Sequence, residues 1–206
     1  MNRVLALSMN EEEKEAIKTL SDAGVLIDPS KHHFEDKHDF MIICCPDGTK
    51  FKYTLSLING MYPDHIWRNL HYHTHTRHGG GLVLSKNSPI AKKGHTTDVD
   101  LLADIQMSVD MGYKSIILLN HLPCKMARLH NIAPLDVVGS LASTKRRIKE
   151  NIKDITVACF LQATKPGDIP GEISEVFHFF SVSKYDAWEK KQSLAKEGVY
   201  SQEVFV

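Results

Sequence analysis

Apolar and polar residues alternate along the chain in patterns that predict both strands and helices. Continuous apolar runs predict three buried strands, at 39–45, 115–119 and 155–161. Weaker or alternating patterns predict three more strands, at 3–7, 70–76 and 176–182. Apolar residues at helical spacing predict four helices, over 10–24, 98–111, 135–151 and 185–196. Strands that alternate with helices indicate an α/β protein with a mainly parallel central sheet flanked by helices.

The segments between these elements are predicted to be loops at 31–38 and 85–96, whereas 51–70 has no clear pattern. The 206 residues suffice for one domain with its own core, and the chain contains no internal repeat or linker. We therefore predict a single domain over 1–206. It would have an N-terminal extension at 1–30, a core at 39–183 and a C-terminal helix and tail at 184–206.

The first predicted helix has clear end signals, because Asn10 precedes three glutamates and Gly24 follows its last apolar residue. It could be an arm that packs on a partner subunit or an amphipathic helix on the surface of its own domain. Its spacing favours the surface helix.

Charge and composition narrow the classes of partner. The chain has 25 basic and 25 acidic residues, so its net charge gives no reason to expect nucleic acid or an anionic membrane as a partner. No apolar run approaches the roughly 20 residues of a membrane helix, and the start lacks a signal-peptide pattern. We therefore expect a cytoplasmic location, where the four cysteines would be thiols or metal ligands rather than disulfides.

Candidate chemistry lies at the carboxyl ends of two predicted strands. The run 115–119 leads into His121 and Cys124, and the run 39–45 ends in Cys45 and is followed by Asp47. Open α/β sheets place their sites at this edge. Two thiolates and one imidazole suit zinc, and three protein ligands leave a fourth position open. A buried thiol beside a loop histidine is an equally good interpretation of the spacing alone.

Three segments carry a family resemblance. Residues 45–49 match the first and third positions of a C-x-D-x-R motif, and 77–80 look like an R-N-A-G segment. Residues 98–124 are similar to a helix and apolar strand that lead into G-H-x-x-C-G. In this order the segments resemble the β-class carbonic anhydrases over roughly 39–183.

The resemblance implies a β-carbonic-anhydrase-like fold and a zinc ion held by Cys45, His121 and Cys124. It implies reversible hydration of carbon dioxide to bicarbonate by a zinc-dependent lyase, with Asp47 orienting the hydroxide, and a homodimer or higher homo-oligomer. Arg77 and Gly80 are candidates for binding the substrate. Arg77 could instead pair with Asp47.

The sequence departs from the family pattern around the predicted ligands. Thr49 stands at the motif's arginine position, with Lys50 next to it, and Asn120 and Lys125 replace two glycines. These changes leave the predicted metal ligands in place but alter the residues around them. Such residues hold the geometry of the ligands, and their loss typically weakens activity. A zinc-binding homologue that has lost the reaction, with a binding or regulatory role, is one alternative. A hydrolase of carbonyl sulfide or carbon disulfide is another.

Three further features bear on the structure. His71, His73 and His75 would share one face of a strand, either as a proton relay or as the polar face of an outer strand. The three glycines at 79–81 would let the backbone approach a neighbour closely. Cys44 and Cys159 are expected in the core.

Overall fold

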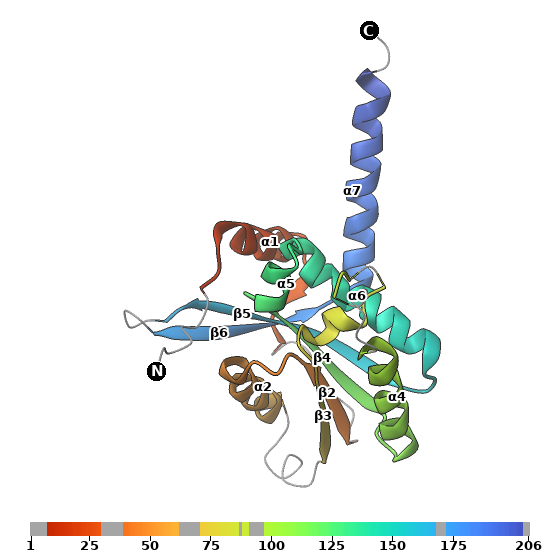
Figure 1. Cartoon of the computed structure of the whole chain (residues 1–206). Coiled ribbons are helices and arrows are strands. Elements are labelled where there is room, and N and C mark those ends of the chain that lie inside the picture. The colour runs from red at the N-terminus through yellow and green to blue at the C-terminus, as the bar shows by residue number, and fades with distance from the viewer. Residues whose placement is uncertain are drawn as a thin grey trace.

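A single six-stranded sheet organises the chain (Figure 1). The computed structural model describes residues 8–29, 39–61, 71–86, 88–90, 97–167 and 172–203. The strands, in the order they take across the sheet, are β1 (Leu26–Ile27), β6 (Ile173–Phe180), β5 (Thr156–Pro166), β4 (Ser115–Leu122), β2 (Phe40–Cys44) and β3 (Tyr72–Thr76). The helices are α1 (Glu11–Asp22), α2 (Gly48–Met61), the 3-10 helix η2 (Gly80–Val83), α4 (Thr97–Asp110), α5 (Lys125–Leu129), α6 (Pro134–Asn151) and α7 (Val182–Glu203).

The predicted α/β class is confirmed, with a mixed rather than uniformly parallel sheet. Strands β3, β2, β4 and β5 are parallel, whereas β6 pairs antiparallel with β5 and β1 pairs antiparallel with β6. The reason is the connection after β5. The chain returns directly, with the Gly167 amide donating to the Glu172 carbonyl at 2.9 Å, whereas a parallel strand would need a crossover helix.

The helices and strands differ from the predictions in a few places. Strand β4 continues through Leu122, so His121 lies within the strand and not in the loop after it. Helix α2 occupies much of the segment 51–70, which had no clear pattern. The predicted strand at 3–7 and the predicted loop at 31–38 lie outside the described residues.

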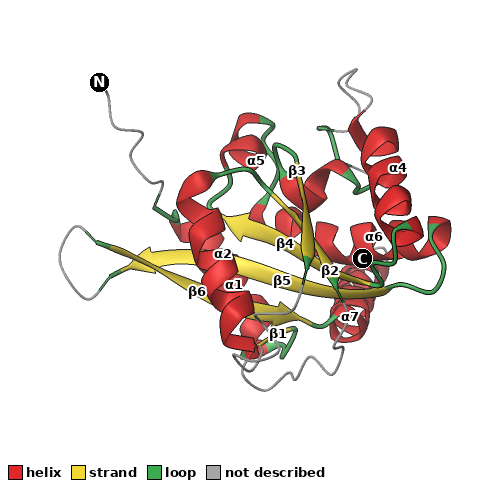
Figure 2. Cartoon of the chain, turned by 90° about the horizontal axis from the view of Figure 1, so that it is seen from below, coloured by secondary structure: helices red, strands yellow, loops and turns green. Residues whose placement is uncertain are grey.

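The two faces of the sheet bury different side chains. Met41 and Ile43 of β2 join the larger core under α1, α4 and α6, whereas Phe40 and Ile42 join a smaller cluster with Ile58 of α2. Figure 2 shows α2 lying across this second face. Strand alternation therefore separates one face covered by several helices from one covered, in the described part, by α2.

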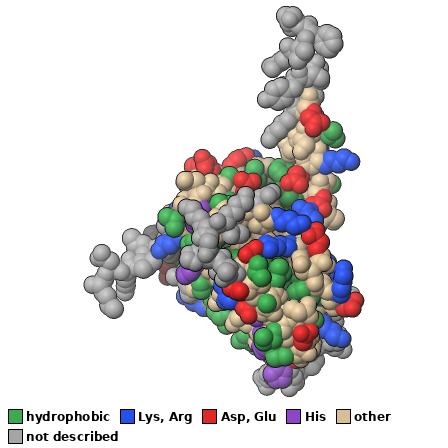
Figure 3. Space-filling view, turned by 45° about the vertical axis from the view of Figure 1, so that its right-hand side comes forward, with side chains coloured by type: hydrophobic (Ala, Val, Ile, Leu, Met, Phe, Trp, Pro, Cys, Tyr) green, Lys and Arg blue, Asp and Glu red, His purple; other side chains and the backbone are tan. Residues whose placement is uncertain are grey.

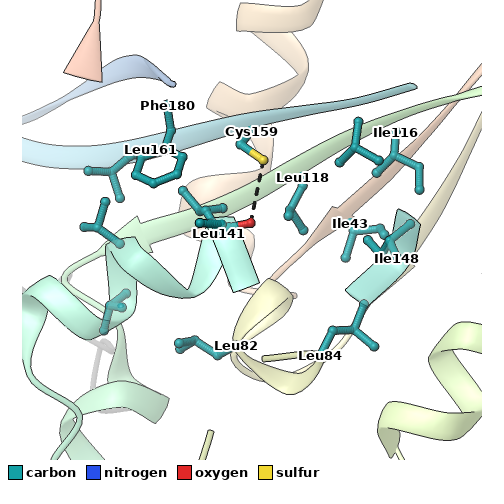
Figure 4. Packing of buried hydrophobic residues seen from close by; sticks show 14 of the residues in the cluster. Ile43, Leu82, Leu84, Ile116, Leu118, Leu141, Ile148, Cys159, Leu161 and Phe180 are labelled. Atoms are coloured by element: carbon teal, nitrogen blue, oxygen red, sulfur yellow. Dashed lines mark hydrogen bonds between the residues drawn. The ribbon is translucent and has the colours of Figure 1, made fainter. Parts of the chain in front are cut away.

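The larger core is built mainly from the central strands and α6 (Figure 4). Leu118, Ile43 and Cys159 meet Leu141 and Ile148, and all five are buried. The Cys159 thiol donates to the Leu141 carbonyl oxygen at 3.8 Å, and burial raises its pKa to about 12. Its predicted place in the core is confirmed, as is that of the buried Cys44.

Helix α1 packs on its own domain. The Glu13 amide donates to the Asn10 side chain, and the Asn10 amide donates to the Glu13 carboxylate, both at 2.9 Å. Ala16 and Leu20 are buried, and Glu13 pairs with Arg128 at 2.6 Å. These contacts agree with the amphipathic surface helix that the spacing favoured.

Helix α7 begins against the body and then extends away from it (Figure 1). Its first turns pack through Tyr185 and Trp188, whose rings lie 5.6 Å apart. Acidic and basic side chains are interspersed along the part of the helix whose side chains are described (Figure 3). No helix among the described residues combines the length and the apolarity needed to cross a membrane.

Helix α4 turns only part of its predicted apolar face inward. The helical spacing placed on that face Val99, Leu102, Ile105, Gln106 and Val109. Ile105 is buried and Leu102 and Val109 pack against the core, whereas Val99 is 64% exposed. Leu101 is fully buried, and the buried Ser108 lies against His73 and His75 of β3.

This orientation predicts unequal costs for two truncations on α4. Leu101→Ala should lower the free energy of unfolding by about 2–5 kcal/mol, because it leaves a cavity in the core. Val99→Ala, the matched control two residues away, should change it by no more than about 0.5 kcal/mol. Urea denaturation of both variants measures the difference. Equal costs would contradict the orientation described here.

Candidate metal centre

The candidate site lies where the strand order reverses. The chain passes from β2 to β3 on one side and then to β4 on the other side of β2. Cys45 follows the end of β2, and His121 and Cys124 lie at the end of β4. Ligand sites of open α/β sheets occupy such a switch point, at the carboxyl ends of the strands. The fold therefore brings these three residues from two distant segments to one edge.

His121 is held with one ring nitrogen engaged and the other free of hydrogen bonds. Its Nδ1 lies 2.8 Å from the carbonyl oxygen of Pro123, which makes Nδ1 the protonated nitrogen. Nε2 is buried without a hydrogen-bond partner, and the residue is only 6% exposed. A carbonyl on one nitrogen and a free lone pair on the other is the arrangement of a metal-binding histidine.

The thiols of Cys45 and Cys124 interact with each other. A hydrogen bond from Cys124 is the largest influence on Cys45 and, with the nearby His121 imidazole, lowers the pKa of Cys45 to about 4, although burial opposes the shift. The same hydrogen bond raises the pKa of Cys124, which keeps its proton. The two pKa shifts are opposite in direction, so the pair favours a thiolate on Cys45 and a thiol on Cys124.

A glycine turn after β3 wraps around Cys45. The Gly79 backbone amide also lowers the pKa of Cys45 by hydrogen bonding, with φ of Gly79 at 92°. A methyl group on Gly80 would lie 2.8 Å from the Cys45 amide nitrogen and 3.1 Å from the Leu119 carbonyl oxygen. The predicted close approach of this backbone is confirmed, and its neighbour is the Cys45 loop.

Asp47 stands at the start of α2. Its carbonyl oxygen accepts from the amides of Lys50 at 2.9 Å and Phe51 at 3.0 Å, so it is the residue that caps the helix. It is partly buried and lies two positions beyond Cys45. Its role beside a metal, which the motif implies, stays a prediction.

Arg77 does not replace the missing motif arginine. Its Nη2 donates to Asp104 of α4 at 2.8 Å and its Nη1 to the Thr76 carbonyl at 3.1 Å. The ion pair of this arginine is thus with Asp104 and not with Asp47. Gly80, the other candidate substrate-binding residue, donates its amide to the Arg77 carbonyl at 2.7 Å and serves the packing of the turn.

The lysine next to the arginine position is also engaged elsewhere. Lys50 is 5% exposed, and its Nζ lies 2.7 Å from Glu175 of β6. This buried ion pair was not predicted from the sequence. It lies on α2 and β6, away from the glycine turn.

The three histidines at 71–75, in and next to β3, lie in two different environments. His73 and His75 are partly buried and contact the Ser108 hydroxyl at 3.3 and 3.0 Å, and burial is the main cause that lowers the pKa of His75. The exposed His71 lies 3.6 Å from Asp39. The predicted outer strand is confirmed, but two of its histidines face α4, and the proton relay stays a hypothesis.

The residues at the switch point fit zinc in donor type. Two cysteines, one of them readily ionised, and a histidine with an oriented, unpartnered Nε2 form a Cys2His set. Within the described ranges, however, no three His, Cys, Asp or Glu side chains are already grouped as a metal site. The donors are neighbours that still have to converge on a common ion.

The sequence reasoning missed several residues that shape the site. The Pro123 carbonyl and the Gly79 amide act through the backbone, so their side chains give no sign of it. Asn120, in place of a glycine, donates to the Val137 carbonyl at 2.8 Å and to Ser140 at 2.7 Å, which ties β4 to α6 next to His121. The presence of asparagine where the motif has glycine was the only feature of the sequence that could have pointed to this role.

Comparison of the chain with protein-family models, with curated proteins and with solved structures finds no match.

The thiol interactions predict an unusual pH profile for alkylation of metal-free protein. Cys45, with a pKa of about 4, should react near its plateau rate at about pH 6, where an ordinary thiol is almost fully protonated. The rate should fall only as the pH drops through about 4. In Cys124→Ala, loss of the hydrogen bond should move this inflection upward. Mass spectrometry of the Cys45 peptide measures both profiles, and identical profiles would refute the thiol interaction.

The glycine turn predicts opposite effects of two Gly→Ala changes. Gly80→Ala places a methyl group on the Cys45 backbone at a φ of 54°, so it should lower the free energy of unfolding by about 1–3 kcal/mol. Gly60→Ala on α2 has no atom within 4 Å of the new methyl group and should raise it by up to about 1 kcal/mol. Thermal unfolding distinguishes them. A tolerated Gly80→Ala would disprove the close packing.

Proposed function

We propose that this protein is a zinc-dependent enzyme that interconverts carbon dioxide and bicarbonate. The observation that supports it best is the meeting of Cys45, Cys124 and His121 at the switch point, with the Nε2 of His121 buried and without a partner. The resemblance of 39–183 to β-class carbonic anhydrases gives the choice of reaction.

In this proposal Cys45, Cys124 and His121 hold the metal. Zinc when bound would act as a Lewis acid that makes hydroxide available near neutral pH. The Pro123 carbonyl fixes the tautomer of His121, and the Gly79 amide and Cys124 stabilise negative charge on Cys45. These contacts prepare the donors before any metal arrives, which lowers the cost of ordering them.

Asp47 is the residue proposed to orient the attacking hydroxide. A carboxylate beside the metal can accept the hydroxide proton as a hydrogen bond and so aim the oxygen at carbon dioxide. Its place at the start of α2, two residues from Cys45, suits this role. Arg77 and the turn at Gly80 remain the proposed contacts of bicarbonate, since the Arg77 side chain is 35% exposed beside the site.

A specific observation also favours a second candidate, a zinc-binding homologue without the reaction. The motif arginine is Thr49, Arg77 is paired with Asp104, and Lys50 is buried with Glu175. The arginine that the resembled family has two positions after its aspartate is thus absent from the motif, and the two nearby cations are committed to other carboxylates. In that family the arginine serves the hydroxide-orienting step, so its absence favours a homologue that binds zinc without the reaction. Hydrolysis of carbonyl sulfide or carbon disulfide would use the same ligands.

The resemblance supports finer proposals as well. These are a β-carbonic-anhydrase-like fold, a homodimer and a cytoplasmic location. Sedimentation of the purified protein tests the dimer independently of activity.

The proposal predicts carbon dioxide hydration by zinc-loaded protein in stopped flow. Metal content is measured on the same sample, with carbonyl sulfide and carbon disulfide as parallel substrates. Hydration should be lost in Cys124→Ser, since that change removes a zinc ligand, and zinc binding should weaken with it.

Asp47→Asn separates the two leading candidates. In the enzyme it should lower hydration at least ~10-fold while zinc stays bound. Stoichiometric zinc without hydration from neutral to alkaline pH would favour the zinc-binding homologue. A wild-type protein that takes up no zinc would exclude both.

A further inference from the structure

A buried polar network lies between α2 and the β5–β6 pair. Lys50 Nζ donates to Glu175 Oε1 at 2.7 Å, and the two side chains are 6% and 0% exposed. The Thr164 hydroxyl donates to the same carboxylate oxygen at 3.0 Å. Thr54 donates to the Gln162 side-chain oxygen at 3.1 Å, and Gln162 Nε2 donates to the Lys50 carbonyl at 3.1 Å. The network thus holds both the side chain and the backbone of Lys50.

Stability alone does not account for this network. Moving two charges out of water costs several kcal/mol each, and well-packed apolar residues often serve as well or better. Glu175 Oε2 is moreover buried without a hydrogen-bond partner, which adds to the cost. This desolvation cost is offset by a gain in specificity where one geometry is needed. Directional polar contacts allow a single arrangement, whereas apolar contacts allow several.

The geometry that the network fixes is that of the candidate metal centre. Gln162 is the β5 partner of His121 in the β4–β5 register. It also holds the first turn of α2, whose capping residue is Asp47. The Gln162 side chain therefore connects two parts of the site. It lies on β5 next to His121, and it binds the first turn of α2, which follows Cys45.

We infer that Lys50, Glu175 and Gln162 are positioning residues for the metal centre. They hold the first turn of α2, and with it the loop of Cys45 and Asp47, at a set distance from His121 and Cys124. Lys50 thereby anchors, through its ion pair with Glu175, a segment that has no arginine at position 49. The metal part of this inference rests on the proposed function, whereas the placement of Cys45 against Cys124 does not.

The test replaces the ion pair with apolar residues of similar size, in Lys50→Met/Glu175→Leu. The thermal midpoint should stay near the wild-type value or rise. Zinc affinity, from competition with a chromogenic chelator, should fall about 10–100-fold. In metal-free protein, dibromobimane, which fluoresces on bridging two nearby thiols, should cross-link Cys45 to Cys124 several-fold more slowly, with the bridge located by peptide mapping.

Two further variants make the test specific. The exchanged pair Lys50→Glu/Glu175→Lys restores opposite charges and should recover most of the affinity and cross-linking. Lys52→Met, on the same helix but exposed, should alter neither. If the double variant fails to fold, Gln162→Met replaces it, because this change removes the hydrogen bond to the Lys50 carbonyl. The same fall in zinc affinity and in cross-linking is expected.

The outcomes separate the two proposals. Unchanged zinc affinity and cross-linking in a folded double variant would overturn the positioning role. Slower cross-linking in that variant, with no zinc uptake by the wild type, would uphold the placement of Cys45 and reject the proposed function. If zinc affinity and cross-linking both fall in the double variant and both recover in the exchanged pair, the positioning role and the proposed metal site are both supported.

Discussion

The parallel pairing of β2 with β4 is the constraint on which the candidate site depends. Its register aligns Ile43 with Leu118, so two residues further along Cys45 comes level with Asn120, beside His121. A slip of one residue would turn every side chain of β2 to the other face. The apolar side chains buried on both faces of β2 oppose such a slip, so the core fixes the distance between the donors.

Strand β3 extends this arrangement to the third segment of the site. The Arg77 amide donates to the Cys44 carbonyl at 3.2 Å, which continues the β2–β3 ladder up to the glycine turn. The turn then folds back so that Gly79 reaches Cys45 and Gly80 fills the space against its backbone. Glycine is required at position 80 because a side chain would displace the residue that the turn contacts.

The sequence could predict the strands and helices that depend on local patterns, but few of the contacts between residues far apart in the chain. Apolar runs locate β2 and β4, and the spacing of His121 and Cys124 points to their common edge. The partner of Lys50 lies 125 positions away on a strand whose direction depends on a hairpin, so no local pattern names it. The same holds for the pairing of Arg77 with Asp104. The extension of β4 through His121 is also set by its neighbour β5, whose pairing continues to Leu122.

The contacts around Cys45 separate the two parts of the proposed function, which are metal binding and hydration. The contacts that stabilise its thiolate come from Cys124, the His121 imidazole and the Gly79 backbone, and none of them depends on an arginine at position 49. The orientation of Asp47, in contrast, is the property that such an arginine would serve. Because different groups support the two properties, a change at position 49 can weaken hydration while the donor set stays intact. The Lys50 anchor can hold the loop in place, but its own charge is committed to Glu175 and does not take over the role of an arginine at position 49.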